Sequence, residues 1–235
     1  MFVQLPLKIG LRDHACFETF VTEEESAAFA LNALQSALKN PSGNAFYLHA
    51  GSGAGKTHLL QAACRYVTEK GQTSVYLPMK DEGLPLIPDV LFGLEQTPLV
   101  CLDDMDNIIG DKKWELALAN LLTKSSVQGH NVILAGEISI VDWSLVTSEL
   151  AKALMNVLPI KLTALHEKDE VIIALQRHAD RLGFELPIEV GNYLVKQFST
   201  DLQELLAVLK MLEQATLVEK RRLTLPFVKK VLGHH

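Results

Sequence analysis

The sequence has few cysteines and no long hydrophobic run, and both absences narrow the class of protein. Its three cysteines, Cys16, Cys64 and Cys101, lie far apart and lack the paired spacing of a zinc site. They predict reduced thiols in a cytoplasmic protein rather than a disulfide-stabilised secreted one. No apolar stretch reaches the length that a membrane-spanning helix needs, so we expect no membrane partner.

The chain also lacks a basic excess. It carries 22 Lys and Arg against 28 Asp and Glu, a net charge of −6. From Ile160 onward the balance is nearly even, so the acidic surplus lies in the first 159 residues. A free-standing DNA-binding domain normally shows a basic surface, and neither part of this chain has that composition. We therefore expect no direct sequence-specific binding to DNA.

Short apolar segments alternate with helical patterns through the first two thirds of the chain. Helices are predicted after Thr22 to about Lys39, from Lys56 to about Lys70 and from Asp111 to Ser125. The strands are predicted at residues 45–48, 74–77, 99–102 and 131–135. Buried strands separated by helices indicate an α/β fold with a parallel sheet that is covered on both faces.

After Pro159 only helical patterns are evident, which predicts a small all-helical domain. Helices are expected at residues 167–182 and 188–198, from Thr200, and in a short segment opened by Pro226. The third of them carries one apolar stripe, more often a core face than an interface: Leu202, Leu205, Leu206, Leu209 and Leu212. The expected organisation is a peptide at 1–12, an α/β domain at 13–159 and a helical domain at 160–235.

A glycine-rich segment joins the first strand to the helix at Lys56, and it matches a phosphate-binding loop. The pattern needs glycine, four residues and then Gly-Lys-Thr, and here Ala50 replaces the first glycine. Such a loop surrounds a phosphate with backbone N–H groups at a helix N-terminus. The alternative is a glycine-rich turn with an exposed lysine. The candidate nucleotide-binding residues are Gly51, Ser52, Gly53, Ala54, Gly55, Lys56, Thr57 and His58.

The third predicted strand ends in two carboxylates, Asp103 and Asp104. The carboxyl ends of parallel strands share one edge of a sheet, so both should lie beside the phosphates. Asp103 and Thr57 are the candidate ligands of Mg²⁺, and Asp104 is a candidate for polarising an attacking water. An apolar strand that ends in Asp-Asp is a weak signal alone, because acidic residues often begin loops. At this distance after a phosphate-binding loop it is strong.

The first residues contain Gln4, Leu5, Pro6 and Leu7, an extended apolar peptide with one amide. Proline has no backbone N–H and restricts the residue before it to extended geometry. The segment is either an ordinary frayed terminus or edge strand, or a docking peptide whose side chains enter pockets of another protein.

Together these motifs resemble the ATPases associated with diverse cellular activities (AAA+), in the branch of the bacterial replication initiator DnaA. The resemblance covers essentially the whole chain and rests on five stretches: Gln4–Leu7, Gly55–Cys64, Leu99–Asp104, Arg181–Pro187 and Leu223–Val228. It implies an AAA+ P-loop domain with a parallel sheet, followed by a helical lid domain. It also implies an adenine nucleotide, ADP or another nucleoside diphosphate, bound with Mg²⁺.

Within this branch the chain is most similar to regulators that inactivate the initiator. The resemblance implies that Gln4, Leu5, Pro6 and Leu7 bind the DNA polymerase III beta sliding clamp. It further implies a homodimer that contacts DnaA and promotes hydrolysis of the ATP bound to DnaA, which prevents re-initiation, while its own ATPase activity is weak or absent. The alternatives are an ATPase that loads or remodels a replication protein, similar to a helicase loader, and an initiator-like DNA binder.

Three departures from the family pattern concern charges around the nucleotide. The segment Ser148–Leu154 resembles the one that carries an arginine finger, but Ala153 stands at the arginine position and Lys152 precedes it. Lysine supplies a point charge without the bidentate fork of arginine. Thr200 stands where the lid normally supplies a second arginine. Glu137 is the candidate for the first sensor residue, with an exposed loop carboxylate as the alternative reading.

Overall fold

The computed structural model describes the chain except residues 1–14, 22–23, 81–85, 166–167, 199–201 and 234–235. The strands are β1 (Ala45–His49), β2 (Ser74–Pro78), β3 (Leu99–Asp103), β4 (Asn131–Gly136) and β5 (Val157–Lys161). The helices are α1 (Glu25–Lys39), α2 (Lys56–Glu69), α3 (Lys112–Gln128), α4 (Ser148–Leu154), α5 (Lys168–Arg181), α6 (Ile188–Gln197), α7 (Leu202–Glu219) and α8 (Leu225–Val231). Short 3-10 helices are η1 (Phe17–Thr19), η2 (Pro88–Leu91), η3 (Leu94–Gln96), η4 (Met105–Asn107) and η5 (Ile140–Asp142).

The five strands form one parallel sheet in the order β2-β3-β4-β1-β5, so the predicted α/β class is confirmed. All four predicted strands are present, and β4 lies between β1 and β3. The ends of β1 and β3 therefore reach the same edge of the sheet, separated by one strand. This topology brings the two sequence motifs to one place.

The fifth strand was not predicted, because it contains Pro159 and buries only Val157 and Ile160. Proline cannot donate a hydrogen bond within a sheet and is therefore confined to edge strands. Here β5 lies at the edge and pairs only with β1, with Pro159 opposite Tyr47. The expected domain boundary after Pro159 falls inside this strand, and the α/β layer continues to Lys161.

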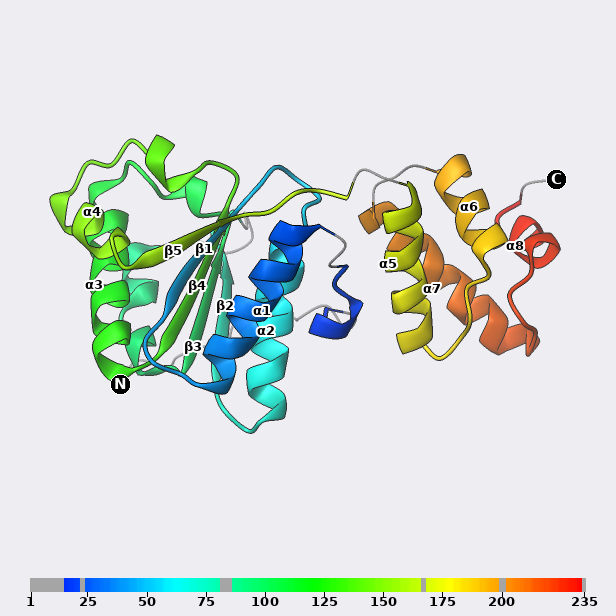
Figure 1. The fold of residues 1–235 in the computed structure, drawn as a ribbon, viewed down its shortest axis with the longest axis horizontal. Helices are drawn as coiled ribbons and strands as arrows, with labels where there is room; N and C mark the ends of the chain where they lie inside the picture. The colour runs from blue at the N-terminus through cyan, green and yellow to red at the C-terminus, as the bar shows by residue number, and fades with distance from the viewer. Residues whose placement is uncertain (1–14, 22–23, 81–85, 166–167, 199–201, 234–235) are drawn as a thin grey trace.

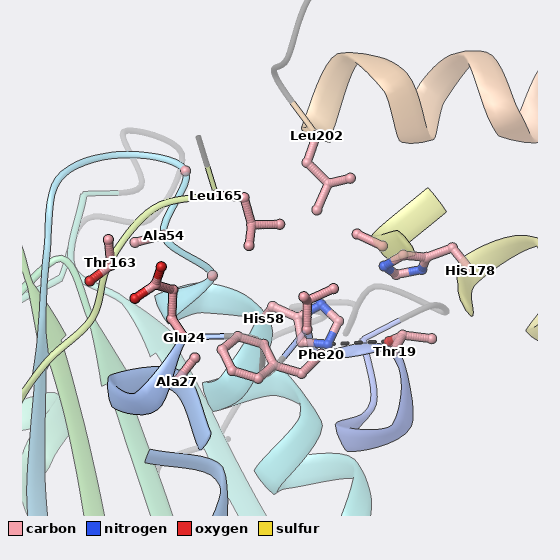
Figure 2. A pocket seen from close by; sticks show the side chains of 14 residues that line it. Thr19, Phe20, Glu24, Ala27, Ala54, His58, Thr163, Leu165, His178 and Leu202 are labelled. Carbon is pink, nitrogen blue, oxygen red and sulfur yellow. Dashed lines mark hydrogen bonds between the residues drawn. The ribbon is translucent and has the colours of Figure 1, made fainter. Parts of the chain in front are cut away.

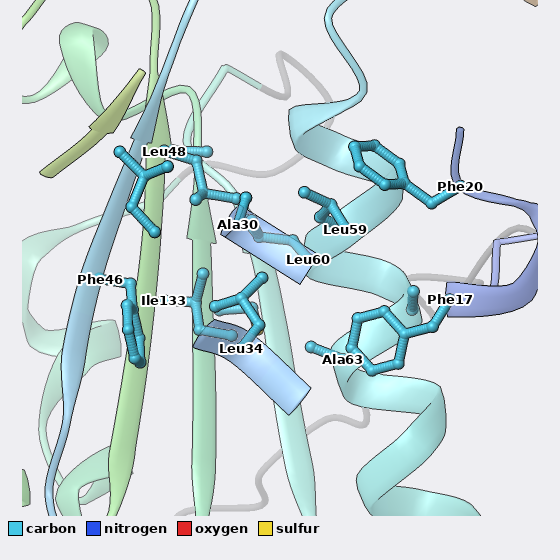
Figure 3. Packing of buried hydrophobic residues seen from close by; sticks show 14 of the residues in the cluster. Phe17, Phe20, Ala30, Leu34, Phe46, Leu48, Leu59, Leu60, Ala63 and Ile133 are labelled. Atoms are coloured by element: carbon cyan, nitrogen blue, oxygen red, sulfur yellow. The ribbon is translucent and has the colours of Figure 1, made fainter. Parts of the chain in front are cut away.

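Each face of the sheet has its own hydrophobic core. On one face, α1 and α2 pack on the strands, and Figure 3 shows Leu34 and Leu60 directed at the sheet. Phe17, the first residue of η1, and Phe20, which follows η1, pack on the other side of α2. On the opposite face, α3 and α4 cover a second core that includes Tyr47 and Trp143. The two covered faces explain why the central strands are almost wholly apolar.

The described residues between 168 and 233 form a helical unit with a third core, as the sequence predicted. Leu205, Leu209 and Leu212 of the predicted stripe are fully buried, and Leu202 and Leu206 pack on that core, so the stripe is core. Figure 1 places this unit beside α2 and η1, on the side of the sheet domain away from α4. None of the described helices is long and apolar enough to cross a membrane.

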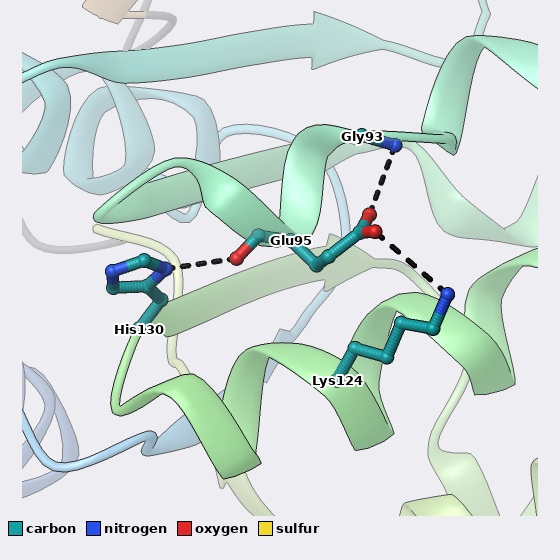
Figure 4. Close-up of polar contacts among 4 residues, drawn as sticks. All are labelled: Gly93, Glu95, Lys124 and His130. Atoms are coloured by element: carbon teal, nitrogen blue, oxygen red, sulfur yellow. Dashed lines mark hydrogen bonds and ion pairs between the residues drawn. The ribbon is translucent and has the colours of Figure 1, made fainter.

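The connection between β2 and β3 is fixed to α3 and β4 through Glu95 (Figure 4). Its carboxylate accepts a hydrogen bond from the Gly93 amide and lies 3.8 Å from the Lys124 ammonium. The Glu95 carbonyl oxygen bonds to the His130 ring at 2.8 Å. These contacts attach η3 to the end of the sheet opposite the phosphate-binding loop.

Two glycines with left-handed backbones give a matched test of how closely the loop before β1 packs on α3. Gly43 has φ +74°, and a Cβ there would lie 2.4 Å from the Ser126 carbonyl oxygen; Gly71 has φ +76° and open space. Both alanine variants should lose about 1–2 kcal/mol to backbone strain. Gly43→Ala should lose roughly 1–3 kcal/mol more, because α3 must move. Urea unfolding measures both, and equal losses would contradict the close approach of this loop to α3.

Candidate nucleotide-binding site

The loop between β1 and α2 has the backbone that phosphate binding requires. Gly53 and Gly55 have φ values of 80° and 82°, a region that residues with a Cβ avoid. A Cβ on Gly55 would lie 2.7 Å from the Phe20 ring, so close packing also demands glycine here. Ala50 is buried, and its φ is not positive. The alanine in place of the first glycine therefore causes no backbone strain.

Lys56 begins α2 and is 7% exposed. Its ammonium donates hydrogen bonds to the carbonyl oxygens of Ala50, at 2.7 Å, and Gly51, at 2.9 Å. The ammonium group thus lies within the loop. Both of these hydrogen bonds go to neutral carbonyl groups, so neither acceptor carries a full negative charge. Phosphate oxygens beside the loop would offer a full negative charge to the same ammonium.

Asp103 is the best-connected polar group of the site and is 1% exposed. One carboxylate oxygen accepts hydrogen bonds from the Thr57 hydroxyl at 2.6 Å and the Tyr76 hydroxyl at 2.9 Å. The other accepts from the Asp104 amide at 3.1 Å. The predicted pair Thr57 and Asp103 therefore meets in the structure. Burial is the main cause that raises the pKa of the Tyr76 hydroxyl, and the charge of Asp103 raises it further. Tyr76 therefore stays a neutral hydrogen-bond donor.

Asp104 follows directly in a left-handed conformation with φ 56°. Burial raises the pKa of its carboxyl group, the charge of Asp103 raises it further, and Lys80 and Lys56 oppose the shift. A carboxylate with a raised pKa is a stronger base than one in water. Asp104 thus has the electrostatic environment of a group that could orient a water.

The set of donors around Thr57 fits a magnesium nucleotide. Mg²⁺ prefers hard oxygen ligands in octahedral geometry and commonly combines one or two protein oxygens with phosphates and water. The Thr57 hydroxyl and Asp103 carboxylate are such ligands. Within the described part of the chain, no group of three or more His, Cys, Asp or Glu could hold a metal ion by itself. The phosphates would therefore supply much of the coordination.

A mostly apolar pocket adjoins the loop, between the sheet domain and the helical unit (Figure 2). Phe20 comes from the segment after η1, Ala54 from the loop, and His178 and Leu202 from the helical unit. An apolar pocket beside a phosphate-binding loop suits a nucleobase. Of these four residues, only Ala54 lies in the motif from which the sequence predicts nucleotide binding. No motif marks the others, because they meet only through the packing of two units.

The η1 segment joins the two units beside this pocket. His58 Nε2 lies 2.7 Å from the Cys16 carbonyl oxygen, and its ring lies edge-on to the His178 ring at 5.8 Å. Arg177 of α5 donates to the Phe20 carbonyl oxygen at 2.6 Å. These contacts place His58 at the junction between α2, η1 and α5. A ligand in the pocket would contact all three elements.

The other candidate residues lie apart from this cluster. Glu137 is exposed after β4, and its charge contributes to the raised pKa of Asp104. Lys152 is exposed on α4, which packs against α3 on the side away from the helical unit. Ala153, the expected arginine position, is partly buried against the second core. Gln4, Leu5, Pro6, Leu7 and Thr200 lie outside the described residues.

Family models match both parts of the chain. The model for the bacterial DnaA ATPase domain matches residues 11–81, and the model for the lid domain of Hda matches residues 168–232. Between them they span more than half of the sequence. They include the phosphate-binding loop and most of the helical unit.

Solved structures agree on the fold. Domain III of DnaA from Thermotoga maritima superposes with a TM-score of 0.71 at 21% identity, covering 95% of this chain and 98% of that one. AMPPCP-bound DnaA from Aquifex aeolicus gives 0.67 at 20% identity, covering 86% and 66%. RuvB from Thermotoga maritima gives 0.63 at 15% identity, covering 93% and 71%. The two family models show that the chain belongs to the DnaA-related AAA+ family and carries an Hda-type lid domain, and the solved structures agree with this fold.

Proposed function

We propose that the chain is a cytoplasmic regulator of replication initiation that promotes hydrolysis of the ATP bound to DnaA while anchored to the DNA polymerase III beta sliding clamp. The observation that carries the proposal is the combination of a DnaA-type nucleotide site with an Hda-type lid, joined across one apolar pocket. Hydrolysis of ATP on DnaA in the presence and absence of this chain and DNA-loaded clamp tests it. A loader of another replication protein would leave that rate unchanged.

The chain's own ligand is proposed to be an adenine nucleotide, ADP, held with Mg²⁺. The glycine loop and Lys56 bind the phosphates, and Thr57 with Asp103 holds the ion. The pocket beside Phe20 and His178 takes the base. When bound, Mg²⁺ neutralises phosphate charge, while the residues of the chain orient the nucleotide and hold the lid against it.

Action on DnaA is proposed to use α4. Lys152 on α4 and Met155 directly after it are both exposed, Met155 at 84%, and α4 lies away from the chain's own nucleotide pocket. A single cation on this helix can approach a nucleotide only on another molecule. This placement supports stimulation in trans.

Anchoring to the clamp is assigned to Gln4, Leu5, Pro6 and Leu7. The described chain begins at Ala15, whose carbonyl oxygen accepts a hydrogen bond of 3.0 Å from Arg65 of α2. The eight Cα–Cα steps from Leu7 to Ala15 can span at most about 28 Å. A clamp bound to the peptide would therefore stay within reach of the nucleotide domain, and a homodimer would carry two such peptides and gain avidity.

Lys56→Ala should weaken nucleotide binding by roughly 10- to 100-fold, the value of one charge-assisted hydrogen bond or two. Excess Mg·ADP should raise the melting temperature of the unaltered chain and have much less effect on the variant, because only bound ligand stabilises. The control is Lys39→Ala, which removes an exposed lysine at the end of α1. Equal shifts in Lys56→Ala and in the unaltered chain would refute the assignment.

Replacing Gln4 and Leu5 together by alanine should reduce clamp affinity at least about tenfold, because the peptide loses an amide and an apolar anchor. Calorimetry with purified clamp measures the change. Mg·ADP binding should be unaltered, which shows that the domain remains folded. The docking role fails if clamp affinity is the same in both proteins.

Lys152→Ala should lower stimulation of DnaA hydrolysis at least about tenfold, less than the loss that removal of an arginine finger causes. Single-turnover hydrolysis on DnaA, with clamp present, gives the rate. Lys39→Ala is again the matched control, since it removes an equally exposed cation elsewhere. An unchanged rate in Lys152→Ala would move the trans-acting charge to another residue.

A further inference from the structure

Two carboxylates from the segment after β3 hold the segment that leads from β4 to α4. The first is Asp106 in η4. Its carboxylate accepts hydrogen bonds from the amides of Glu137 and Ile138 and, at 3.4 Å, from the Trp143 indole. Asp106 therefore fixes the start and the middle of this segment.

The second is Glu115, near the start of α3, which is fully buried. Its carboxylate accepts from the Thr147 amide and hydroxyl, both at 2.8 Å, and from the Val146 amide at 3.0 Å. It also accepts from the Gly110 amide at 3.0 Å. Burial opposes ionisation of Glu115, but these hydrogen bonds outweigh it and lower the pKa of the carboxyl group. Thr147 is the N-cap residue of α4, so Glu115 fixes the point at which α4 begins.

Both carboxylates follow the nucleotide site directly in the chain. Asp103 ends β3, Asp104 follows it, Asp106 lies in η4, and Gly110 and Glu115 come after that turn. A cation near Thr57 and Asp103 would draw on the carboxylate that now bonds the Asp104 amide. Any resulting shift of η4 would reach residues 137–147 through Asp106 and Glu115. No residue of α4 lines the apolar pocket beside the phosphate-binding loop, so α4 has no contact with a group bound in that pocket.

Stability alone does not require an ionised group at Glu115. Replacing a buried charge and its partners by apolar residues is often neutral or stabilising, whereas hydrogen bonds of fixed direction specify one arrangement. Filling a core with an ionised carboxylate costs desolvation free energy that an apolar side chain would not cost. The four bonds to two separate segments instead make the two segments move together.

We propose that Asp106 and Glu115 are positioning residues that couple the nucleotide site to α4, so that a bound nucleotide sets the position and order of the helix. The coupling itself concerns this chain alone. Its use, regulation of the action of α4 on DnaA by the chain's own nucleotide, rests on the function proposed above.

Hydrogen exchange of residues 146–156 with and without saturating Mg·ADP tests the coupling in the full chain. We expect Mg·ADP to slow exchange in this segment roughly threefold or more in the unaltered chain. Glu115→Gln keeps the size of the side chain but sets an amide NH₂ against N–H donors. It should still bind Mg·ADP, measured by calorimetry, and lose the slowing at 146–156. Glu69→Gln, an exposed glutamate at the end of α2, should behave as the unaltered chain.

Two results would overturn the inference: no response of residues 146–156 to bound Mg·ADP in the unaltered chain, or an equal response in Glu115→Gln. If Glu115→Gln does not fold, Thr147→Val removes one hydroxyl bond at constant shape, and the same comparison decides. Asp106→Asn should give the same loss from the other end of the segment. A coupled chain that does not stimulate DnaA would refute the proposed function and leave the coupling intact; a chain that does not bind Mg·ADP would refute both.

Discussion

The hydrogen bonds of the Asp103 carboxylate are the interactions on which the arrangement of the sheet domain depends. Asp103 ends β3, and its three hydrogen bonds reach α2 through Thr57, β2 through Tyr76, and the following turn through the Asp104 amide. A buried carboxylate is tolerated only where such donors surround it. These three bonds position the loop, the neighbouring strand and the turn after β3 relative to one another. They leave hard oxygen atoms at the edge of the sheet, where a magnesium nucleotide would need them.

Two connections extend from this centre toward opposite sides of the molecule. On one side, η1 packs on α2. Beside the phosphate-binding loop, Arg177 of α5 donates to the Phe20 carbonyl oxygen after η1, and the His178 ring of α5 contacts the His58 ring of α2. On the other side, Asp106 and Glu115 tie residues 137–147, and with them α4, to the segment after β3. The lid, the proposed base pocket and the proposed partner-facing helix thus depend on elements that begin or end at one edge of the sheet.

Local patterns in the sequence predicted the parts of this arrangement whose chemistry is contiguous in the chain. The loop from Gly51 to Thr57 and the pair Asp103–Asp104 could be placed at one edge, because strands followed by helices make a parallel sheet. The leucine stripe of α7 could be recognised as core from its period. The strand β5 could not be predicted, because its proline interrupts the apolar residues. As an edge strand with one neighbour in the sheet, it also lacks the continuous apolar run that marked the other strands.

The sequence by itself determined the fold class, the phosphate-binding loop, the carboxylates that face it and the helical nature of the last third, because each depends on residues close together in the chain. Only the tertiary structure decided which distant residues meet. Phe20 approaches Gly55 and His178 approaches His58 at the nucleotide site, and Glu115 reaches Thr147 at the start of α4. It also decided that Lys152 is exposed on α4 while Ala153 packs inward. A side chain's neighbours across a fold depend on how helices and sheet pack, and short-range patterns carry little of that information.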